Sequence, residues 1–272
     1  MNKSNEQGTV SALKRGIAVL HCFSAGPRTL SNGEISALTK VPKPTVARLA
    51  ATLVSLGLMR QDPETEKYSL GAGVLGLSQA FLSGLDVRAH ARPHMTRLAE
   101  ASGGSVYLGV RDGLEMVIIE TCRARESVLS VRLDVGSRLP IATSALGRAL
   151  LSALDATELS QLLEQLHRSS ERDWPRLSSG IDRALRDAAT LGFCASLGEF
   201  RAEVNSIAVP LTLPGGERVA INCGGPAFAF PESRLHEEIA PQLLAAARAV
   251  AKEVGGTIEH PELHRAQQSK TA

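Results

Sequence analysis

Apolar positions in the first 60 residues repeat at helical spacing in three separate segments. The first covers 10–24 and carries its apolar residues mostly on one side. The second begins after Ser31, which stands three residues before Glu34 in a capping-box pattern, and ends near Thr39. The third covers 42–57, has prolines in its first turn, where a missing N–H is tolerated, and ends at a glycine. The pattern therefore predicts three helices, the second barely two turns long.

The third predicted helix has two distinct faces. Apolar residues recur along one side of it, at Val46, Leu49, Leu53 and Leu56. Thr45, Arg48 and Thr52 lie on a separate, polar face. A short helix, a tight turn and a second amphipathic helix with a basic, hydroxyl-bearing outer face form the arrangement that reads the DNA major groove. We therefore predict a helix-turn-helix whose outer face supplies base contacts.

The turn before this helix contains Lys40 at a position that is commonly glycine, because the backbone there often has a positive φ. That conformation costs a residue with a side chain about 1 to 2 kcal/mol. Either the turn has a different geometry here or the domain tolerates the strain.

Two short strand-like runs, 58–61 and 67–70, flank a turn-rich segment and predict a β-hairpin wing. Arg60, Lys67 and the Tyr68 hydroxyl could reach phosphate oxygens beside the groove, which would add affinity without sequence information. The alternative for each charge is an ordinary solvated side chain. The full predicted DNA-binding set is Ser31, Lys43, Thr45, Arg48, Thr52, Arg60, Lys67 and Tyr68.

After the hairpin, residues 71–76 read Gly-Ala-Gly-Val-Leu-Gly, a literal G-x-G-x-x-G. In a dinucleotide-binding fold, this motif joins a strand to a helix that leads to a parallel strand. Here the preceding strand belongs to a hairpin, and the chain continues into another helical segment at 87–101. We interpret the motif as part of a linker helix over 71–85, and no nicotinamide cofactor is expected.

From residue 105 onward the hydrophobic pattern changes to alternation. Alternating apolar residues lead into Asp112 and Gly113 and then into a second such run, which indicates a β-hairpin. The last helix begins at Pro231 and has a long apolar face. This mixture predicts one antiparallel sheet covered by helices, an α+β domain. The other predicted strands are 127–133, 193–197, 205–213 and 217–223, and the other predicted helices are 144–153, 155–166 and 179–191.

Composition and charge fit two unequal globular domains in a chain of 272 residues. The first 70 residues hold nine Lys and Arg against five Asp and Glu, and the remainder holds 21 against 23. A polyanionic partner is therefore expected at the N-terminal end. The N-terminal segment is polar and no run of about 18 apolar residues is present, so a cytoplasmic protein without membrane association is expected. Four scattered cysteines predict buried thiols in a reducing compartment.

Candidate chemistry for an enzyme is sparse. His90 and His94 have the i, i+4 spacing of two metal ligands, but nothing completes a metal motif, so a structural or surface role is favoured. His260 and His264 lie in a polar tail interrupted by a proline. We therefore predict no catalytic residue, no metal and no cofactor. The alternative is an enzyme or metabolite-binding protein without DNA binding; a purely structural protein would leave the polar face of the third helix unexplained.

Seven stretches together resemble the IclR family of bacterial transcriptional regulators. In chain order they are LKRGIAVLHCF, VPKPTVARLAATLVSLGLM, DPETEKYSLGAGVLGLS, ARPHMTRLAEASG, VGSRLPIATSALGRALL, EFRAEVNSIAVPL and VAINCGGP. The resemblance implies a winged helix-turn-helix DNA-binding domain at 10–70, a linker helix at 71–85, a GAF-like α+β effector-binding domain at 86–255 and a polar tail at 256–272. It also implies homodimers or homotetramers on double-stranded operator DNA and a small-molecule effector, with RNA polymerase as a further candidate partner.

The resemblance also suggests, by position in the matching stretches, an effector pocket of small or neutral polar residues. Backbone N–H groups at the start of the helix predicted at 144–153 could bind a carboxylate, although Thr143 and Ser144 could equally do no more than cap that helix. The expected effector is a catabolic metabolite such as an organic or aromatic acid, and the protein is expected to be a repressor or an activator. The suggested residues are Thr143, Ser144, Ala145, Leu146, Ser196, Ser206, Asn222 and Gly224.

Two positions depart from the family pattern. Ser196 stands where members often have an acidic residue, and Glu203 stands where they often have glycine. Glu199 and Arg201 lie near the pocket motif and could pair with each other or with an acidic effector, and the sequence does not separate these alternatives. Effector binding is expected to shift the paired DNA-binding domains through the linker helix, a coupling typically worth about 1 to 3 kcal/mol.

Overall fold

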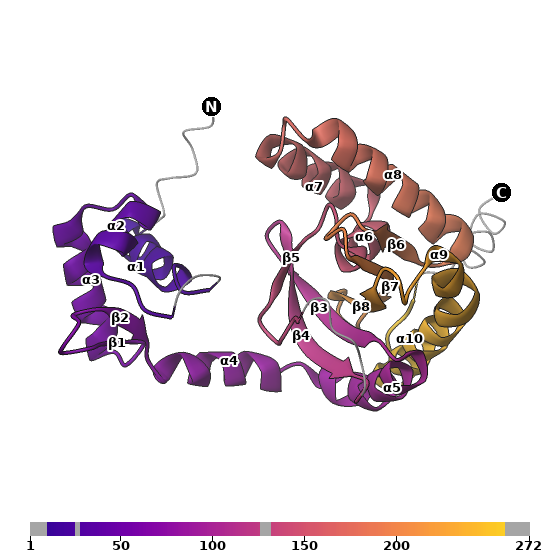
Figure 1. Cartoon of the computed structure of the whole chain (residues 1–272), viewed down its shortest axis with the longest axis horizontal. Coiled ribbons are helices and arrows are strands. Elements are labelled where there is room, and N and C mark those ends of the chain that lie inside the picture. Colours follow the sequence, from indigo (N-terminus) through magenta and orange to yellow (C-terminus); the bar gives the residue numbers. More distant parts are fainter. Residues whose placement is uncertain (1–9, 25–27, 126–131, 259–272) are drawn as a thin grey trace. The chain divides into compact units, whose positions relative to one another are not determined.

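The computed structural model describes residues 10–24, 28–125 and 132–258. The chain divides into two compact units, Met1–Gly84 and Leu85–Ala272, which are considered separately below (Figure 1). The first is helical with a hairpin, and the second is an α+β unit with an antiparallel sheet. The fold class expected from the sequence is therefore confirmed.

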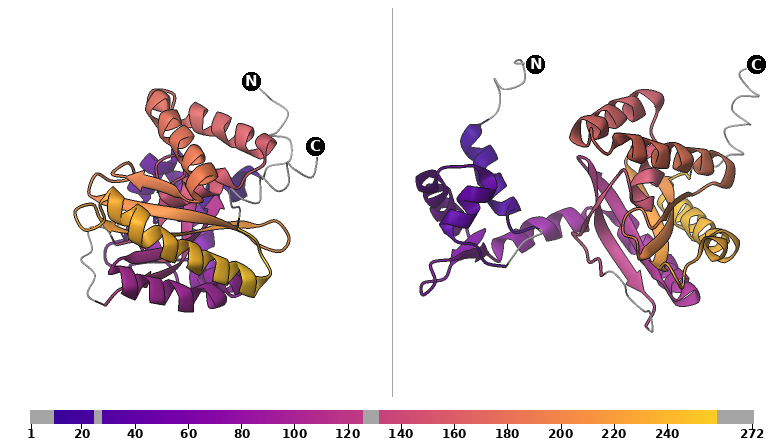
Figure 2. Two further views of the ribbon diagram at one scale, coloured as in Figure 1. Left: turned by 90° about the vertical axis from the view of Figure 1, so that its right-hand side faces the viewer. Right: turned by 45° about the horizontal axis from the view of Figure 1, so that its top comes forward.

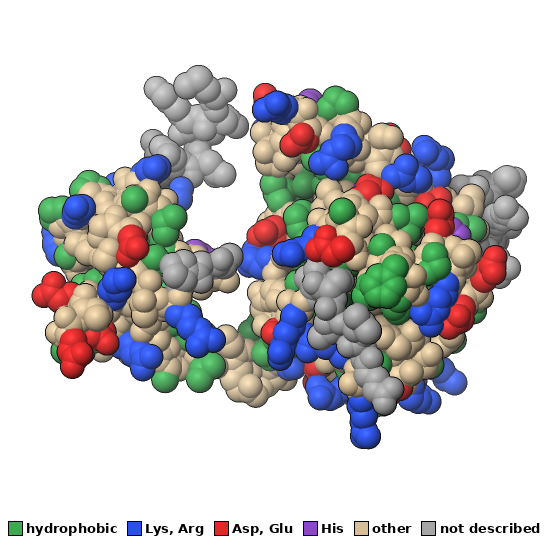
Figure 3. All heavy atoms as spheres, viewed as in Figure 1, with side chains coloured by type: hydrophobic (Ala, Val, Ile, Leu, Met, Phe, Trp, Pro, Cys, Tyr) green, Lys and Arg blue, Asp and Glu red, His purple; other side chains and the backbone are tan. Residues whose placement is uncertain are grey.

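The first unit consists of three helices and a hairpin. Its elements are α1 (Ser11–His21), α2 (Asn32–Thr39), α3 (Lys43–Ser55), β1 (Met59–Gln61) and β2 (Tyr68–Leu70). The two strands pair antiparallel. One apolar cluster joins all of these elements, because each contributes at least one buried side chain: Val19, Leu30, Ile35, Val41, Val46, Ala50, Leu53, Met59 and Tyr68. Figure 3 shows both apolar and basic side chains on the surface of this unit.

The start of α2 is held by the capping box that the sequence predicts. The Ser31 hydroxyl accepts a hydrogen bond from the Glu34 N–H at 3.3 Å, and the Glu34 carboxylate accepts one from the Ser31 N–H at 2.7 Å. Both donors would otherwise lack partners at a helix N-terminus. These hydrogen bonds and the hydroxyl's 2.7 Å bond to the carboxylate lower the pKa of Glu34 below its ordinary value.

Lys40 ends α2 in the left-handed conformation, with φ 59° and ψ 20°. The domain therefore tolerates the strain at a position where glycine is common. We expect Lys40→Gly to raise the free energy of unfolding of the first unit by about 1 kcal/mol, because glycine removes the Cβ clash at a smaller entropic cost. Urea unfolding with hydrogen exchange of the α2 and α3 amides measures this effect. Lys40→Ala keeps the Cβ while removing the charge, so an equal gain in that variant would contradict the explanation.

Helix α4 (Gly73–Ser83) follows the hairpin, and none of its residues is buried. Two glycines of the G-x-G-x-x-G sequence lie against the turn that follows α3. The Gly71 N–H bonds to the Leu58 carbonyl at 2.8 Å and the Gly73 N–H bonds to the Gly57 carbonyl at 3.0 Å. A Cβ on Gly73 would lie 2.8 Å from that carbonyl oxygen, and one on Gly71 would collide with it. These two glycines thus allow a close backbone approach within the first unit, which gives each of them a structural role.

The second unit begins with a helix and a hairpin, and later strands complete the sheet. Its strands are β3 (Ser105–Asp112), β4 (Glu115–Arg123), β5 (Arg138–Pro140), β6 (Cys194–Leu197), β7 (Val204–Thr212) and β8 (Arg218–Pro226). Its helices are α5 (Asp86–Ser102), α6 (Ala145–Ser152), α7 (Ala156–Ser169), α8 (Trp174–Leu191), α9 (Glu232–Arg234) and α10 (Ala240–Val254), with a π-helical turn at Leu235–Ile239.

The six strands form one antiparallel sheet in the order β5-β4-β3-β8-β7-β6. Helices α5 and α10 pack side by side on one face, and α6 packs on the other with α7 and α8 beyond it (Figures 1 and 2). The larger apolar cluster lies between the sheet and α6, and it includes Tyr107, Ile118, Leu146, Cys194 and Ala208. We call this side of the sheet the α6 face.

Some details of the second unit differ from the expectation. The short strand β5 was not predicted, because three residues are too few to show an alternation. The strand predicted at 127–133 lies mainly outside the described residues, and 132–133 is not a strand. Thr257, assigned to the polar tail, exchanges two backbone hydrogen bonds of 2.8 Å with Thr212. Within the described ranges, no helix combines the length and apolar character needed to span a membrane.

Candidate functional sites

The outer surface of α3 carries the residues predicted to contact bases. Val46, Ala50 and Leu53 face the core of the unit, while Arg48 and Thr52 are exposed and Thr45 is half-buried. No other described side chain forms an ion pair or hydrogen bond with the Arg48 guanidinium. A basic group that is exposed and unengaged within its own unit is free to bind an external acceptor.

A groove between α1 and α3, with a volume of about 910 Å³, borders this surface. Thr45, Arg48 and Thr52 line it together with Arg15 of α1 and several apolar residues. Arg15 was counted in the charge of the N-terminal end but not assigned to a site. That it lines the same groove as Arg48 could not be inferred from spacing, because the two residues lie on different helices.

Lys43 lies against the N-terminus of α2, since its Cε is 3.7 Å from the position that a Cβ on Gly33 would occupy. The Asn32 amide donates to the Lys43 carbonyl at 3.2 Å, which holds the first turns of α2 and α3 together. A lysine beside a helix N-terminus favours an anion such as a phosphate. The Ser31 side chain is already used in the capping box, so its predicted contact with DNA competes with that role.

The hairpin places two of its three predicted contact residues on the surface. Arg60 and Lys67 are exposed, and the Arg60 Nε donates to the Ser69 hydroxyl at 2.9 Å. Tyr68 differs from the prediction, because its side chain is only 7% exposed and belongs to the core of the unit. Its backbone forms a bridge with Leu30, a pairing between distant residues that the local pattern does not reveal.

In the second unit, the sheet register brings several suggested effector residues into one row on the α6 face. Ser196 of β6 pairs with Ser206 of β7, and Ser206 pairs with Gly224 of β8. Ser105 of β3 continues the row opposite Gly224. Direct cross-strand partners point to the same face of a sheet. The three serines are 9% exposed or less, so the row is a buried polar strip in an otherwise apolar layer.

The N-terminus of α6 lies over this strip. Ser144 is its N-cap, and its hydroxyl accepts from the Gly147 N–H at 3.1 Å. The Ser196 hydroxyl donates to the Thr143 carbonyl at 2.7 Å, which ties the start of α6 to β6. Ala145 and Leu146 follow and are buried in the adjoining apolar cluster. The capping role of Ser144 is therefore present in the structure, whatever else this segment binds.

Asn222 and Gly224 both have structural roles that limit what they offer to a ligand. The Asn222 Oδ1 accepts from the Tyr107 N–H at 3.1 Å, so its amide N–H groups are the part left for other partners. A Cβ on Gly224 would collide with the backbone of Asn205 and the side chain of Ser206. Close strand approach therefore explains this glycine without a ligand.

Comparisons with known proteins identify the family of this chain. Residues 12–63 match the IclR helix-turn-helix domain, and residues 79–252 match the bacterial transcriptional regulator IclR C-terminal domain. The chain belongs to the IclR family. A curated member, the HTH-type transcriptional regulator TsaQ1/TsaQ2 of Comamonas testosteroni, is 33% identical over 238 residues, which cover 87% of this chain and 85% of that protein.

Solved structures of IclR proteins share the two-domain layout. The crystal structure of an IclR family transcriptional regulator from Brucella abortus has a TM-score of 0.85 and 39% identity, and covers 93% of this chain and 96% of that one. An IclR homologue from Microbacterium hydrocarbonoxydans, complexed with 4-hydroxybenzoate, has a TM-score of 0.70 and 24% identity, and covers 90% of this chain and 99% of that one. This IclR-family protein is thus a transcriptional regulator with a helix-turn-helix DNA-binding domain and an IclR C-terminal domain. Its matched relatives are regulators rather than enzymes.

The sequence left the partner of Glu199 open, and the structure places Glu199 in an ion-pair network beside the candidate effector site. Glu199 pairs with Arg148 of α6 and, at 2.6 Å, with Arg183 of α8. It does not pair with Arg201, whose guanidinium lies over the Phe200 ring at 5.6 Å. Burial raises the pKa of Glu199, but the two guanidinium groups lower it further, so the net pKa lies below its ordinary value.

Arg148 is the central member of this network and is only 1% exposed. Besides Glu199, it donates to the Ala142 carbonyl at 3.1 Å and to the Ala195 carbonyl at 2.9 Å. It thereby joins the segment before α6 to β6, the two elements that carry Thr143, Ser144 and Ser196. A Cβ on Gly180 of α8 would collide with the ion pair, so this glycine makes room for it.

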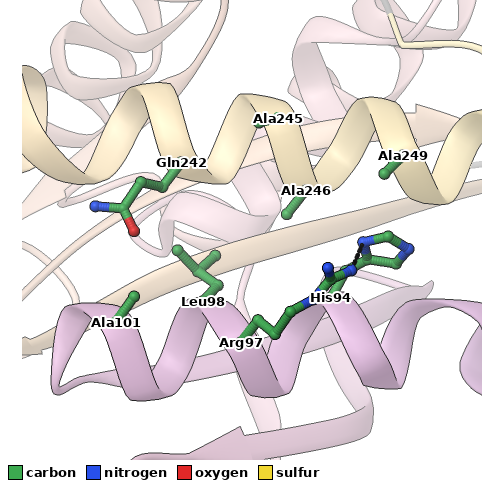
Figure 4. A pocket seen from close by; sticks show the side chains of 8 residues that line it. All are labelled: His94, Arg97, Leu98, Ala101, Gln242, Ala245, Ala246 and Ala249. Carbon is green, nitrogen blue, oxygen red and sulfur yellow. Dashed lines mark hydrogen bonds between the residues drawn. The ribbon is translucent and has the colours of Figure 1, made fainter.

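On the opposite side of the sheet, a cavity of about 450 Å³ lies between α5 and α10 (Figure 4). Its polar groups already have partners: Arg97 donates to the His94 Nδ1 at 2.8 Å, and the His94 Nε2 lies 2.8 Å from a Glu253 oxygen. His90 lies 3.4 Å from the same carboxylate. Within the described residues, no cluster of three or more metal-ligating side chains is present.

The cysteines give no sign of a reactive thiolate. Cys122, Cys194 and Cys223 are buried, and only Cys22 is half-buried. Burial raises the pKa of Cys194 to about 12 and that of Cys223 to about 11, so both remain protonated thiols at neutral pH.

Proposed function

We propose that the chain acts in the cytoplasm, without enzymatic activity, as a homodimer or a dimer of dimers that binds pseudo-palindromic operator DNA. Two copies of α3 would enter successive major grooves, with the spacing set by two-fold symmetry. The observation that carries this proposal is the exposed α3 face, on which Arg48 has no partner among the described residues. Phosphates around this face would be bound by Lys43, Arg60 and Lys67, and these contacts would position the domain on DNA without sequence preference.

We also propose that the effector is an organic or aromatic acid bound at the α6 face, between the buried serine strip and the N-terminus of α6. Small hydroxyl-bearing residues can supply hydrogen bonds that orient a ligand. The 4-hydroxybenzoate complex of the fold neighbour indicates that this fold can accommodate an aromatic acid. Effector binding would change either operator occupancy or contact with RNA polymerase.

The Arg48→Ala variant tests the recognition surface. Binding of the purified protein to DNA upstream of its own gene is compared with binding to random DNA at about 150 mM salt, which suppresses non-specific phosphate attraction. If Arg48 pairs with a guanine edge, its loss should weaken operator binding by about 1 to 3 kcal/mol and leave binding to random DNA nearly unchanged.

Arg60→Ala is the matched control, because a phosphate contact should weaken binding to both DNAs to a similar degree. An unchanged ratio of operator to random affinity in Arg48→Ala would reject the proposed reading face. Equally weak binding of the wild-type protein to both DNAs would count against this operator.

A further inference from the structure

Two buried polar atoms on strand β4 have no hydrogen-bond partner among the described residues: the Thr121 hydroxyl oxygen and the Arg123 Nε. The two residues are separated by a single position. A buried polar group without a hydrogen bond lowers the stability of a folded protein, so two such groups on one strand need an explanation. An acceptor supplied from outside the chain would satisfy the Arg123 N–H and the Thr121 hydroxyl together.

The register places both residues on the α6 face. Thr121 pairs with Tyr107 of β3, and Arg123 pairs with Ser105. Ser105 is the end of the serine strip described above, and Tyr107 is opposite Asn222. The unpartnered groups therefore extend the proposed effector site by one strand, to β4. The intervening residue, Cys122, points to the α5 side, where its thiol donates to the Arg92 carbonyl.

Arg123 supplies a positive charge at this end of the strip. Its Nη2 is occupied by the Leu133 carbonyl and, at 2.9 Å, by the Asp134 carboxylate. Partial burial lowers the pKa of Arg123, but hydrogen bonds with Asp134 and with the Tyr107 phenol raise it further, so the group stays charged. Asp134 is 59% exposed, so solvent screens its charge more effectively than that of the guanidinium, which is 21% exposed. Binding of a second anion at the Arg123 Nε is therefore still electrostatically favourable.

We propose that Arg123, Thr121 and Tyr107 form the subsite that binds the carboxylate of the effector. This inference rests on the effector site proposed above and adds to it a basic subsite that recognises the ligand's negative charge. The serine strip then orients the remainder of the ligand. Arg123 and Ser206 are three strand spacings apart, about 14 Å, and an arginine side chain spans nearly half of that distance. The site thus suits a small acid that lies across β3 and β8.

The positive charge of the subsite predicts that it binds carboxylates more tightly than their neutral isosteres. Isothermal titration calorimetry with benzoate and benzamide measures that preference in the full chain. We expect wild type to bind benzoate roughly tenfold or more tightly than benzamide, because a charged hydrogen bond in a shielded site contributes that much. Arg123→Gln should abolish the difference, and Arg111→Gln, which changes an exposed arginine of β3, should preserve it.

Thr121→Val separates a binding role from a structural one. Removing an unpartnered buried hydroxyl leaves the ligand-free unfolding midpoint unchanged or raises it, because no hydrogen bond is lost. Benzoate binding should nevertheless weaken severalfold. A variant in which stability falls and benzoate affinity does not would overturn the assignment of Thr121.

Ser206→Phe distinguishes failure of the subsite from failure of the site. If benzoate binds wild type and Arg123→Gln equally while Ser206→Phe abolishes binding, the effector site stands and the subsite is overturned. If benzoate does not bind wild type, or binds no more tightly than benzamide, the carboxylate subsite is also overturned. The operator assay with Arg48→Ala then continues to test the proposed DNA-binding function independently.

Discussion

Replacing Glu199 with glutamine is expected to lower the free energy of unfolding of the C-terminal unit by about 3 to 5 kcal/mol at neutral pH, because the change leaves a buried charge without its counter-ion. Arg148 is 1% exposed, so water cannot replace the lost carboxylate. Glutamine preserves the size of the side chain and one oxygen acceptor, which separates the loss of charge from the loss of packing. Chemical unfolding of the full chain, followed by a probe in α6 or α8, measures the change.

The pH dependence of this effect has a definite sign. The folded-state pKa of Glu199 lies below its ordinary value, so its carboxylate stabilises the fold at pH values above the unfolded-state pKa, about 4.3. That contribution is lost as the pH falls through the folded-state pKa and the carboxylate becomes protonated. The difference between wild type and Glu199→Gln should therefore shrink below about pH 4.

Arg183→Gln and Glu164→Gln are suitable controls. Arg183 pairs with the same carboxylate but is 56% exposed, and Glu164 forms an exposed helical pair with Arg168. Each should cost less than about 1 kcal/mol, because exposed ion pairs contribute little. If all three variants were equally stable, the ion pair of the buried Arg148 would not contribute more to stability than the exposed pairs do.

Placing lysines at Leu77 and Phe81 of α4 is expected to convert the proposed dimer to monomers at micromolar concentration. The two side chains are 65% and 52% exposed and lie one helical turn apart. An apolar helix that buries none of its residues within its own chain is suited to pack against a second copy. Burying both side chains in each of two protomers would contribute up to about 8 kcal/mol, so the dissociation constant should rise roughly a hundredfold or more.

Analytical ultracentrifugation measures the association, and the operator assay measures its consequence. A monomer engages one half-site at a time, so operator affinity should fall along with dimerisation. Gln79→Lys adds a charge to an exposed polar position of the same helix and should leave both measurements unchanged. A double variant that remains dimeric would exclude this face of α4 as the interface.

The parts of the fold that were predicted from sequence are those determined by local chemistry. The capping box at Ser31, the prolines that open α3 and the Asp112–Gly113 hairpin each depend on residues within a few positions of one another. The polar face around Arg48 was predictable for the same reason, because helical periodicity separates it from the buried stripe.

The misses depend on contacts between residues that are far apart in the chain. Glu199 pairs with Arg148, 51 positions earlier, and Tyr68 is buried because it bridges to Leu30. Strand alternation shows that Arg123 and Thr121 share a face, but only the register shows that this face is the one with the serine strip. The sequence could suggest which residues are polar, but not which of them meet.

The backbone hydrogen bonds from Gly71 and Gly73 to the Leu58 and Gly57 carbonyls, in the turn between α3 and β1, have a mechanical consequence for signalling. They fix the start of α4 and the exit of the hairpin to the turn that follows the recognition helix. A rotation of α4 about its axis would therefore move the wing and the turn that follows α3 together. A glycine-rich sequence usually indicates a flexible backbone, but here it forms a fixed connection between α4 and the hairpin.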